Sequence, residues 1–102
     1  MTASRTPAQG RRSSRDDLER RLSEETGGEP RWWSNGPGDR YGWHDHPYHK
    51  VLFCSEGSIV FHLHDRDVEL VAGDRLDVEP GTEHAATVGG QGVTCVEAPR
   101  SR

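Results

Sequence analysis

Residues 44–64 have the sequence HDHPYHKVLFCSEGSIVFHLH, which joins a cluster of histidines to two runs of β-forming residues. In the second run, Ile59, Phe61 and Leu63 occupy every other position. Alternation with a period of two is typical of a strand with one buried face. Similar short segments continue to residue 97 between Gly, Pro and Asp turns, without a helical pattern. This part of the chain therefore predicts an all-β barrel or sandwich.

Turn residues divide this region into short predicted strands. Trp32 and Trp33 could form the first of them, before turn chemistry at residues 35–39. The glycine-containing pairs at residues 56–57 and 89–90 are expected to separate neighbouring strands. The other predicted strands are residues 51–54, 58–64, 67–71, 75–79, 84–88 and 93–97.

The residues able to build a core lie in the second part of the chain. All three Trp, both Tyr, both Phe, both Cys and all six His follow residue 31 of 102, and only 30% of the chain is hydrophobic. We expect one β-barrel domain over residues 32–98 and a C-terminal tail over residues 99–102. So small a core gains from pairing with a second copy, and we therefore expect a homodimer.

The N-terminal part, residues 1–31, predicts a disordered tail with one short helix. Residues 1–12 show no periodicity. Residues 13–17, SSRDD, are typical of a helix N-terminus because hydroxyls cap free N–H groups and acids complement the helix dipole. Leu18 and Leu22 then lie on one face before a Gly-Gly pair. A helix of about three turns is marginal alone, so it either packs on the barrel or frays.

The charge balance disfavours nucleic acid as a partner. The net charge is −4, and residues 32–102 hold six basic and eleven acidic residues, which would repel a phosphate backbone. No apolar run is long enough to span a membrane, and no secretory signal is present. We expect a cytoplasmic protein with no nucleic acid or membrane partner. In that compartment Cys54 and Cys95 would be thiols, buried as small hydrophobic residues.

The histidines point to a metal site. His44 and His46 are two residues apart, so in an extended segment both imidazoles face the same side and can converge on one ion. A third ligand must come from elsewhere in the fold. His84 is the natural candidate because the loop at residues 80–83 can aim it inward. One divalent transition metal is therefore the expected cofactor.

Two groups of residues resemble the motifs of the cupin family. His44-Asp45-His46, Lys50 and Gly57 match the spacing of the first motif, in which two His are followed by a Glu and a Gly. Gly73, Glu79-Pro80-Gly81 and His84 are similar to the second motif. The resemblance implies a jelly-roll barrel of roughly six to eight strands. It also implies Fe, Mn, Zn, Ni or Cu near the open end, held by three His and one Glu.

Position 50 departs from this pattern, since a lysine ammonium cannot ligate a cation. Three alternatives follow: a three-His site with more open positions, a Lys50 that points away, or a barrel that has lost its metal. His49 is a candidate fourth ligand if the turn at Pro47-Tyr48 changes the face on which it lies.

Further residues are expected to line a pocket. Tyr41 and Trp43 flank the first motif, and Lys50 could anchor a substrate carboxylate. His62 and His64 share the strand face opposite Ile59 and Phe61, which is either solvent or the barrel interior, and we assign them a structural or pocket-lining role.

Two classes of function fit the sequence. The first is a metal-dependent enzyme for a small molecule, resembling either thiol dioxygenases or isomerase- and lyase-type cupins. The second is a non-catalytic module that binds a metal or small ligand, or an apo scaffold. Fold alone does not choose between them.

Overall fold

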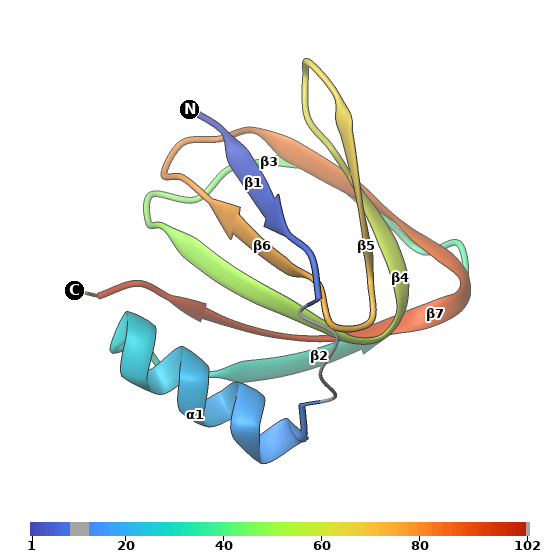
Figure 1. The fold of residues 1–102 in the computed structure, drawn as a ribbon. Helices are drawn as coiled ribbons and strands as arrows, with labels where there is room; N and C mark the ends of the chain where they lie inside the picture. The colour runs from blue at the N-terminus through green and yellow to red at the C-terminus, as the bar shows by residue number, and fades with distance from the viewer. Residues whose placement is uncertain (9–12, 102) are drawn as a thin grey trace.

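Figure 1 shows the computed structural model of the chain, which describes residues 1–8 and 13–101. The described part is mostly antiparallel strand with one helix, as the sequence predicts, and this helix is too short and polar to cross a membrane. The elements are β1 (Ala3–Thr6), α1 (Arg15–Thr26), β2 (Arg31–Asn35), β3 (Arg40–His44), β4 (Lys50–His62), β5 (Asp67–Val71), β6 (Arg75–Val78) and β7 (His84–Pro99).

The two long strands β4 and β7 pair along their whole length and organise the sheet. Lys50 lies opposite Pro99 at one end of this pair and His62 lies opposite Ala85 at the other. The pair bends, so that its two parts belong to two sheet halves. The first half has the order β1-β6-β4-β7-β2, and the second contains β5, β4, β7 and β3. Figure 1 shows this curvature in the green and orange-red strands.

Glycines make the bend without ending the strands. Gly57 and Gly92 have φ values of 75° and 79°, in the left-handed region that favours glycine. A Cβ at Gly57 would lie 1.9 Å from the carbonyl oxygen of Gly92. The register shifts on both sides of Gly57, as in a β-bulge. The strand ends predicted on either side of Gly57 are therefore wrong, because a bulge and a turn have the same glycine signature.

The hydrophobic core lies between the two sheet halves. Leu52 and Cys54 point into it from the first part of β4, and Ile59 and Phe61 from the second part, so the predicted alternation is observed. Both Cys54 and Cys95 are fully buried free thiols. The other buried members are Ala3, Leu63, Val68, Leu70, Leu76, Val78, Ala86, Val88 and Val93.

Helix α1 packs on the outside of the first sheet half. Ser14 caps its N-terminus by accepting a hydrogen bond from the Asp17 backbone N–H, and Gly27 ends it in the left-handed conformation. Leu18 and Leu22 are buried against the outward-facing residues of β4 and β7. The helix therefore packs rather than frays. Its outer partners are Val51, Phe53, Val96 and Ala98, with Trp32 at the edge.

The N-terminal segment is not the wholly disordered tail that the sequence predicts. Residues Ala3–Thr6 form β1 and pair with β6, and Ala3 is buried in the core. A strand thus precedes the helix. A segment of four residues is too short to show the alternation of a strand. It becomes a strand only because the edge of β6 supplies its hydrogen-bond partners. The remaining part of the expected tail, residues 9–12, lies outside the described residues.

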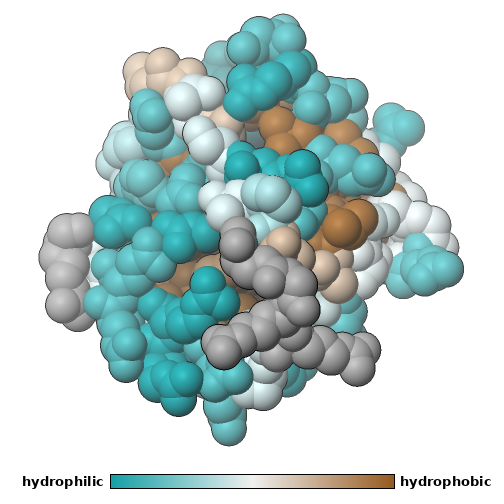
Figure 2. Space-filling model, in the orientation of Figure 1, coloured by the Kyte–Doolittle hydropathy of each residue, from teal (hydrophilic) through white to brown (hydrophobic). Residues whose placement is uncertain are grey.

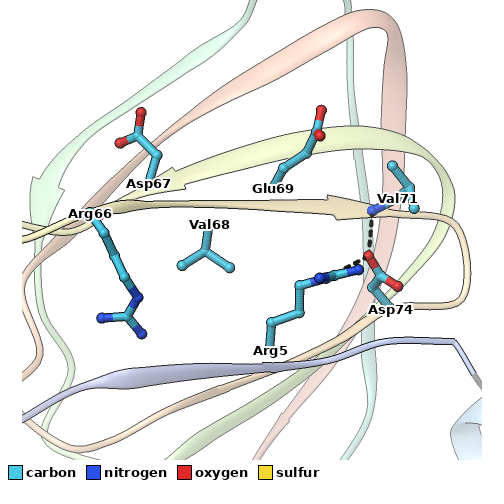
Figure 3. A pocket seen from close by; sticks show the side chains of 7 residues that line it. All are labelled: Arg5, Arg66, Asp67, Val68, Glu69, Val71 and Asp74. Carbon is cyan, nitrogen blue, oxygen red and sulfur yellow. Dashed lines mark hydrogen bonds and ion pairs between the residues drawn. The ribbon is translucent and has the colours of Figure 1, made fainter.

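The expected barrel is not closed by backbone hydrogen bonds. Among the described residues, β1 does not pair with β5, nor β2 with β3. Side chains span both openings instead. Arg66 donates to the Ala3 carbonyl, and Arg5 lies 3.1 Å from Asp74 beside the pocket between β1 and β5 (Figure 3). Across the other opening, the rings of Trp33 and Tyr41 meet edge to face, with centroids 5.8 Å apart.

The face of the molecule shown in Figure 2 is largely hydrophilic, with smaller hydrophobic areas between the polar side chains. The large hydrophobic side chains exposed in the described structure are Met1, Tyr41, Trp43 and Val71.

Candidate metal centre

Three histidines from two strands and one loop meet inside one end of the sandwich. His44 ends β3 and His84 begins β7, directly opposite each other in the ladder. His46 follows in the loop after β3. One ring nitrogen from each residue lies within 4.8 Å of the others, which is close enough for all three to hold one ion. The structure thus brings together the three residues that the sequence analysis selected.

Backbone carbonyls orient two of these rings. His44 Nδ1 lies 2.7 Å from the Gly42 oxygen, and His84 Nδ1 lies 2.8 Å from the Thr82 oxygen. A carbonyl oxygen only accepts, so each Nδ1 carries the proton and each Nε2 keeps its lone pair free. This is the arrangement found in metal-ligating histidines, whose second nitrogen donates to a fixed acceptor.

The free ring nitrogens are buried without a partner. Nε2 of His46 and Nε2 of His84 have no hydrogen bond, although both atoms are inaccessible to solvent. A buried polar atom without a partner is costly and rare in folded proteins. An ion held between the rings would satisfy both atoms, so this donor set fits a metal.

The electrostatics of the site favour the neutral, ligating form of two of the rings, those of His46 and His84. Burial lowers the pKa of His46, and the charge of Lys50 lowers it further. Burial also lowers the pKa of His84, against the hydrogen bond to Thr82, which raises it. Both imidazoles therefore have a lower tendency to take up a proton than a free histidine.

The loop before β7 connects the two parts of the site. Gly81 donates its backbone N–H to the carbonyl of His46 at 2.8 Å, and Thr82 donates its own to Glu79 at 3.2 Å. Gly81 has a φ of 78°, which permits this turn. The loop thus holds the first histidine segment against the second and leaves His84 fully buried.

Lys50 faces the same interior as the histidines. It begins β4 on the inward side, in phase with Leu52, and its side chain is only 7% exposed. Its Nζ lies 3.5 Å from Oε1 of Glu97, and that oxygen also accepts a hydrogen bond from Trp33 Nε1 at 2.8 Å. The alternative in which Lys50 points away from the site is therefore wrong.

His49, the candidate fourth ligand, does not join the cluster. Its Nε2 lies 3.0 Å from Oδ1 of Asp77, and Asp77 also pairs with Arg75. His49 stands immediately before the inward-facing Lys50, so strand alternation turns it toward the opposite face. The turn at Pro47-Tyr48 does not reverse that alternation.

His62 and His64 lie outside the sandwich rather than in the pocket. His62 contacts Asp67 and Thr87, each at 2.8 Å, across the outer face. His64 pairs with Glu83 and stacks on Trp43, with ring centroids 4.4 Å apart. Of the two alternatives that the sequence left open for this strand face, the structure shows solvent.

Trp43 is likewise half exposed on the outside, whereas Tyr41 packs against Trp33 at the edge of the interior. The two residues therefore do not lie together at the mouth of the site, as the sequence had led us to expect. Tyr41 belongs to the opening between β2 and β3, and Trp43 belongs to the outer surface.

Three residues beside the site were not selected from the sequence. Tyr48 stacks on His46 at 5.1 Å between centroids, and burial raises the pKa of its hydroxyl. Phe61 lies 6.2 Å from His84 between ring centroids, and Glu97 pairs with Lys50. Glu97 and Phe61 had a local signal, because each falls on the inward face of a predicted strand, Glu97 in phase with Cys95 and Phe61 in phase with Ile59.

The fold and the site define a small antiparallel β-sandwich with three converging imidazoles at one end. Residues 31–96 match the family model described as Cupin domain. This match covers more than half of the chain, and the chain belongs to the cupin family.

Solved cupin structures share the fold. A cupin-2 domain protein from Shewanella frigidimarina is 20% identical with a TM-score of 0.61, over 71% of this chain and 70% of that one. A double-stranded β-helix protein from Klebsiella pneumoniae is 25% identical with a TM-score of 0.64, over 74% of this chain and 70% of that one.

A third similar structure comes from work on the DMSP lyases RdDddP and RnDddQII. It is 26% identical with a TM-score of 0.66, over 72% of this chain but only 38% of that one. Comparison with curated proteins found no match.

Proposed function

We propose that this cupin binds one divalent transition metal ion through His44, His46 and His84, and binds or transforms a small molecule at that ion. The two buried Nε2 atoms without partners carry the proposal. Together with the lone pair of His44, they form a ready set of three neutral nitrogen donors. Their proximity within 4.8 Å supports one shared ion rather than separate sites.

The donor set favours a metal of intermediate softness. Three imidazoles without thiolate suit Zn, Fe or Ni better than Ca or Mg. Three protein ligands leave coordination positions open, as a catalytic site requires. When bound, such an ion would polarise a ligand atom or lower the pKa of a bound water. Tyr48 and Phe61 flank the rings and would shield this chemistry from solvent.

An enzyme of lyase, isomerase or dioxygenase type is the first version of the proposal. The similarity to a structure from DMSP lyase work supports the lyase version, although this chain spans only part of that protein. Non-catalytic binding is the second version, favoured by Lys50 at the position where the resemblance implies a carboxylate ligand. Turnover assays on the metal-loaded protein separate the two versions.

The test of metal binding is elemental analysis of protein purified without an affinity tag, followed by dialysis against Zn²⁺, Ni²⁺, Mn²⁺ or, without oxygen, Fe²⁺. We expect one ion per chain for at least one metal. Failure of all four to bind in stoichiometric amount would contradict the proposal.

We also propose that two copies of this chain form a homodimer. The exposed Trp43 and Tyr41, on a strand that pairs only with β7 in the described structure, support an association through this edge. Light scattering after size exclusion tests it, and a monomeric mass at micromolar concentration would contradict it.

A further inference from the structure

Lys50 is the only lysine of this chain; the other twelve of its 13 basic residues are arginine. It is also one of the few charged residues that the described structure buries. Burying an ammonium group is unfavourable unless its donors find partners. The place of this single lysine, inside the sandwich beside three histidines, therefore needs an explanation.

The partners inside the protein do not saturate Lys50. An ammonium group has three N–H donors. Among the described residues, Glu97 is its one anionic partner, and the 3.5 Å separation is longer than a good charged hydrogen bond. The same Glu97 oxygen is engaged by Trp33 at 2.8 Å. Lys50 thus keeps donors available toward the interior that it shares with His46 and His84.

The charge balance of the centre points the same way. Three neutral imidazoles leave the charge of a divalent ion uncompensated. Among the described residues no carboxylate joins the three rings as a ligand, and Glu97 lies at 3.5 Å from Lys50 rather than in the cluster. An anionic ligand is attracted both by the ion and by Lys50, and the low dielectric of a buried site strengthens both attractions.

We infer that the small molecule taken at this centre is a carboxylate, and that Lys50 is the specificity-determining residue that contacts its anionic group. This inference rests on the proposed metal site. The ammonium group of Lys50 is a compact point charge, so it can contact one oxygen of a small carboxylate while the other oxygen faces the ion.

The test uses the full chain loaded with Co²⁺, whose visible absorption reports changes at the ion. Acetate is titrated as the probe, acetamide as its neutral analogue of the same shape, and inorganic phosphate as the competing anion. We expect wild-type protein to bind acetate more tightly than either, by about tenfold, the lower range for a hydrogen bond to a charged group.

Two variants should move acetate binding in opposite directions. Lys50→Met removes the ammonium group and should weaken acetate about tenfold. Glu97→Gln removes the charge that neutralises Lys50 and should strengthen acetate. Acetamide should change little in either variant. Arg20→Met, on the helix outside the sheet, changes the net charge as Lys50→Met does and should leave acetate binding unchanged.

The outcomes separate this inference from the proposed function. If wild-type protein takes up no Co²⁺, the metal site itself is wrong and this inference fails with it. If Co²⁺ binds but acetate affinity is equal in wild type and Lys50→Met, the metal site stands and the role of Lys50 is overturned. If Lys50→Met does not fold, the Glu97→Gln variant decides instead. An acetate affinity equal to that of wild type would then overturn the role of Lys50. Tighter binding of phosphate overturns the choice of a carboxylate.

Discussion

His44 and His84 occupy opposed positions of the antiparallel β3–β7 ladder, and their ring centroids lie 4.3 Å apart. They lie 40 positions apart in the chain, so only strand pairing brings them together. The register shifts between Tyr41 and His44, and this irregularity sets His44 opposite His84. The histidine cluster is thus a consequence of sheet register as well as of histidine spacing.

Replacing His84 by alanine should abolish stoichiometric metal retention. His84 supplies one of the three nitrogens and is fully buried, and among the described residues no further His, Cys, Asp or Glu joins the cluster to replace it. Metal content after dialysis measures the effect. His62→Ala is the matched control, because His62 contacts Asp67 and Thr87 on the outer face and should retain the ion. Loss of metal in the control alone would place the site elsewhere.

Replacing Lys50 by glutamate should tighten metal binding while weakening the metal-free fold. The new carboxylate would face the same interior as the three imidazoles and could complete a four-ligand set. Without metal it would lie beside Glu97, and two like charges in a half-buried site repel. Metal titration and thermal unfolding with and without metal measure both effects. A Lys50→Glu protein with unchanged metal affinity would show that this carboxylate does not reach the ion.

Replacing Asp74 by asparagine should lower the free energy of unfolding at neutral pH. It should also make that free energy less sensitive to acid. Burial raises the pKa of Asp74, but hydrogen bonds from the Val71 and Ala8 backbone and from Arg5 outweigh this and lower the pKa. Figure 3 shows the bonds from Val71 and Arg5. A lowered pKa stabilises the fold above the unfolded value of about 3.9, and that stability is lost as pH falls through the folded pKa.

We expect Asp74→Asn to cost about 1–3 kcal/mol at pH 7, measured by urea unfolding. Below about pH 4 the difference from wild type should shrink. Glu69→Gln, at an exposed position of the same pocket, is the control. If the difference in unfolding free energy between wild type and Asp74→Asn is the same at pH 7 and at the acidic pH, the charge of Asp74 does not stabilise the fold.

Replacing Leu22 by alanine should destabilise the protein by about 2–5 kcal/mol, as expected for a fully buried leucine. Leu22 anchors α1 to the outer face of β4 and β7, away from the histidines. Metal stoichiometry should therefore persist in the folded variant. Chemical unfolding gives the free energy, and exposed Glu24→Ala should stay within about 0.5 kcal/mol of wild type. A small effect at Leu22 would mean that the helix is only loosely attached.

The sequence predicted those parts of the fold that depend on local patterns. The alternation of Ile59 and Phe61 identified a half-buried strand, and Leu18 with Leu22 identified the face of a capped helix. The β1 strand escaped prediction because its pairing edge belongs to β6, far along the chain. The bend at Gly57 escaped because a bulge within one strand and a turn between two strands use the same residue.

By itself, the sequence determined which histidines can act together. Parity in an extended segment predicted that His44 and His46 face one side, and the loop at residues 80–83 predicted that His84 joins them. Tertiary structure decided where Lys50 points, that Glu97 lies beside it, and that His62 faces solvent. Those outcomes depend on which face of each strand is covered by the other sheet half. Pairing between distant segments determines this, and no local sequence pattern encodes such pairing.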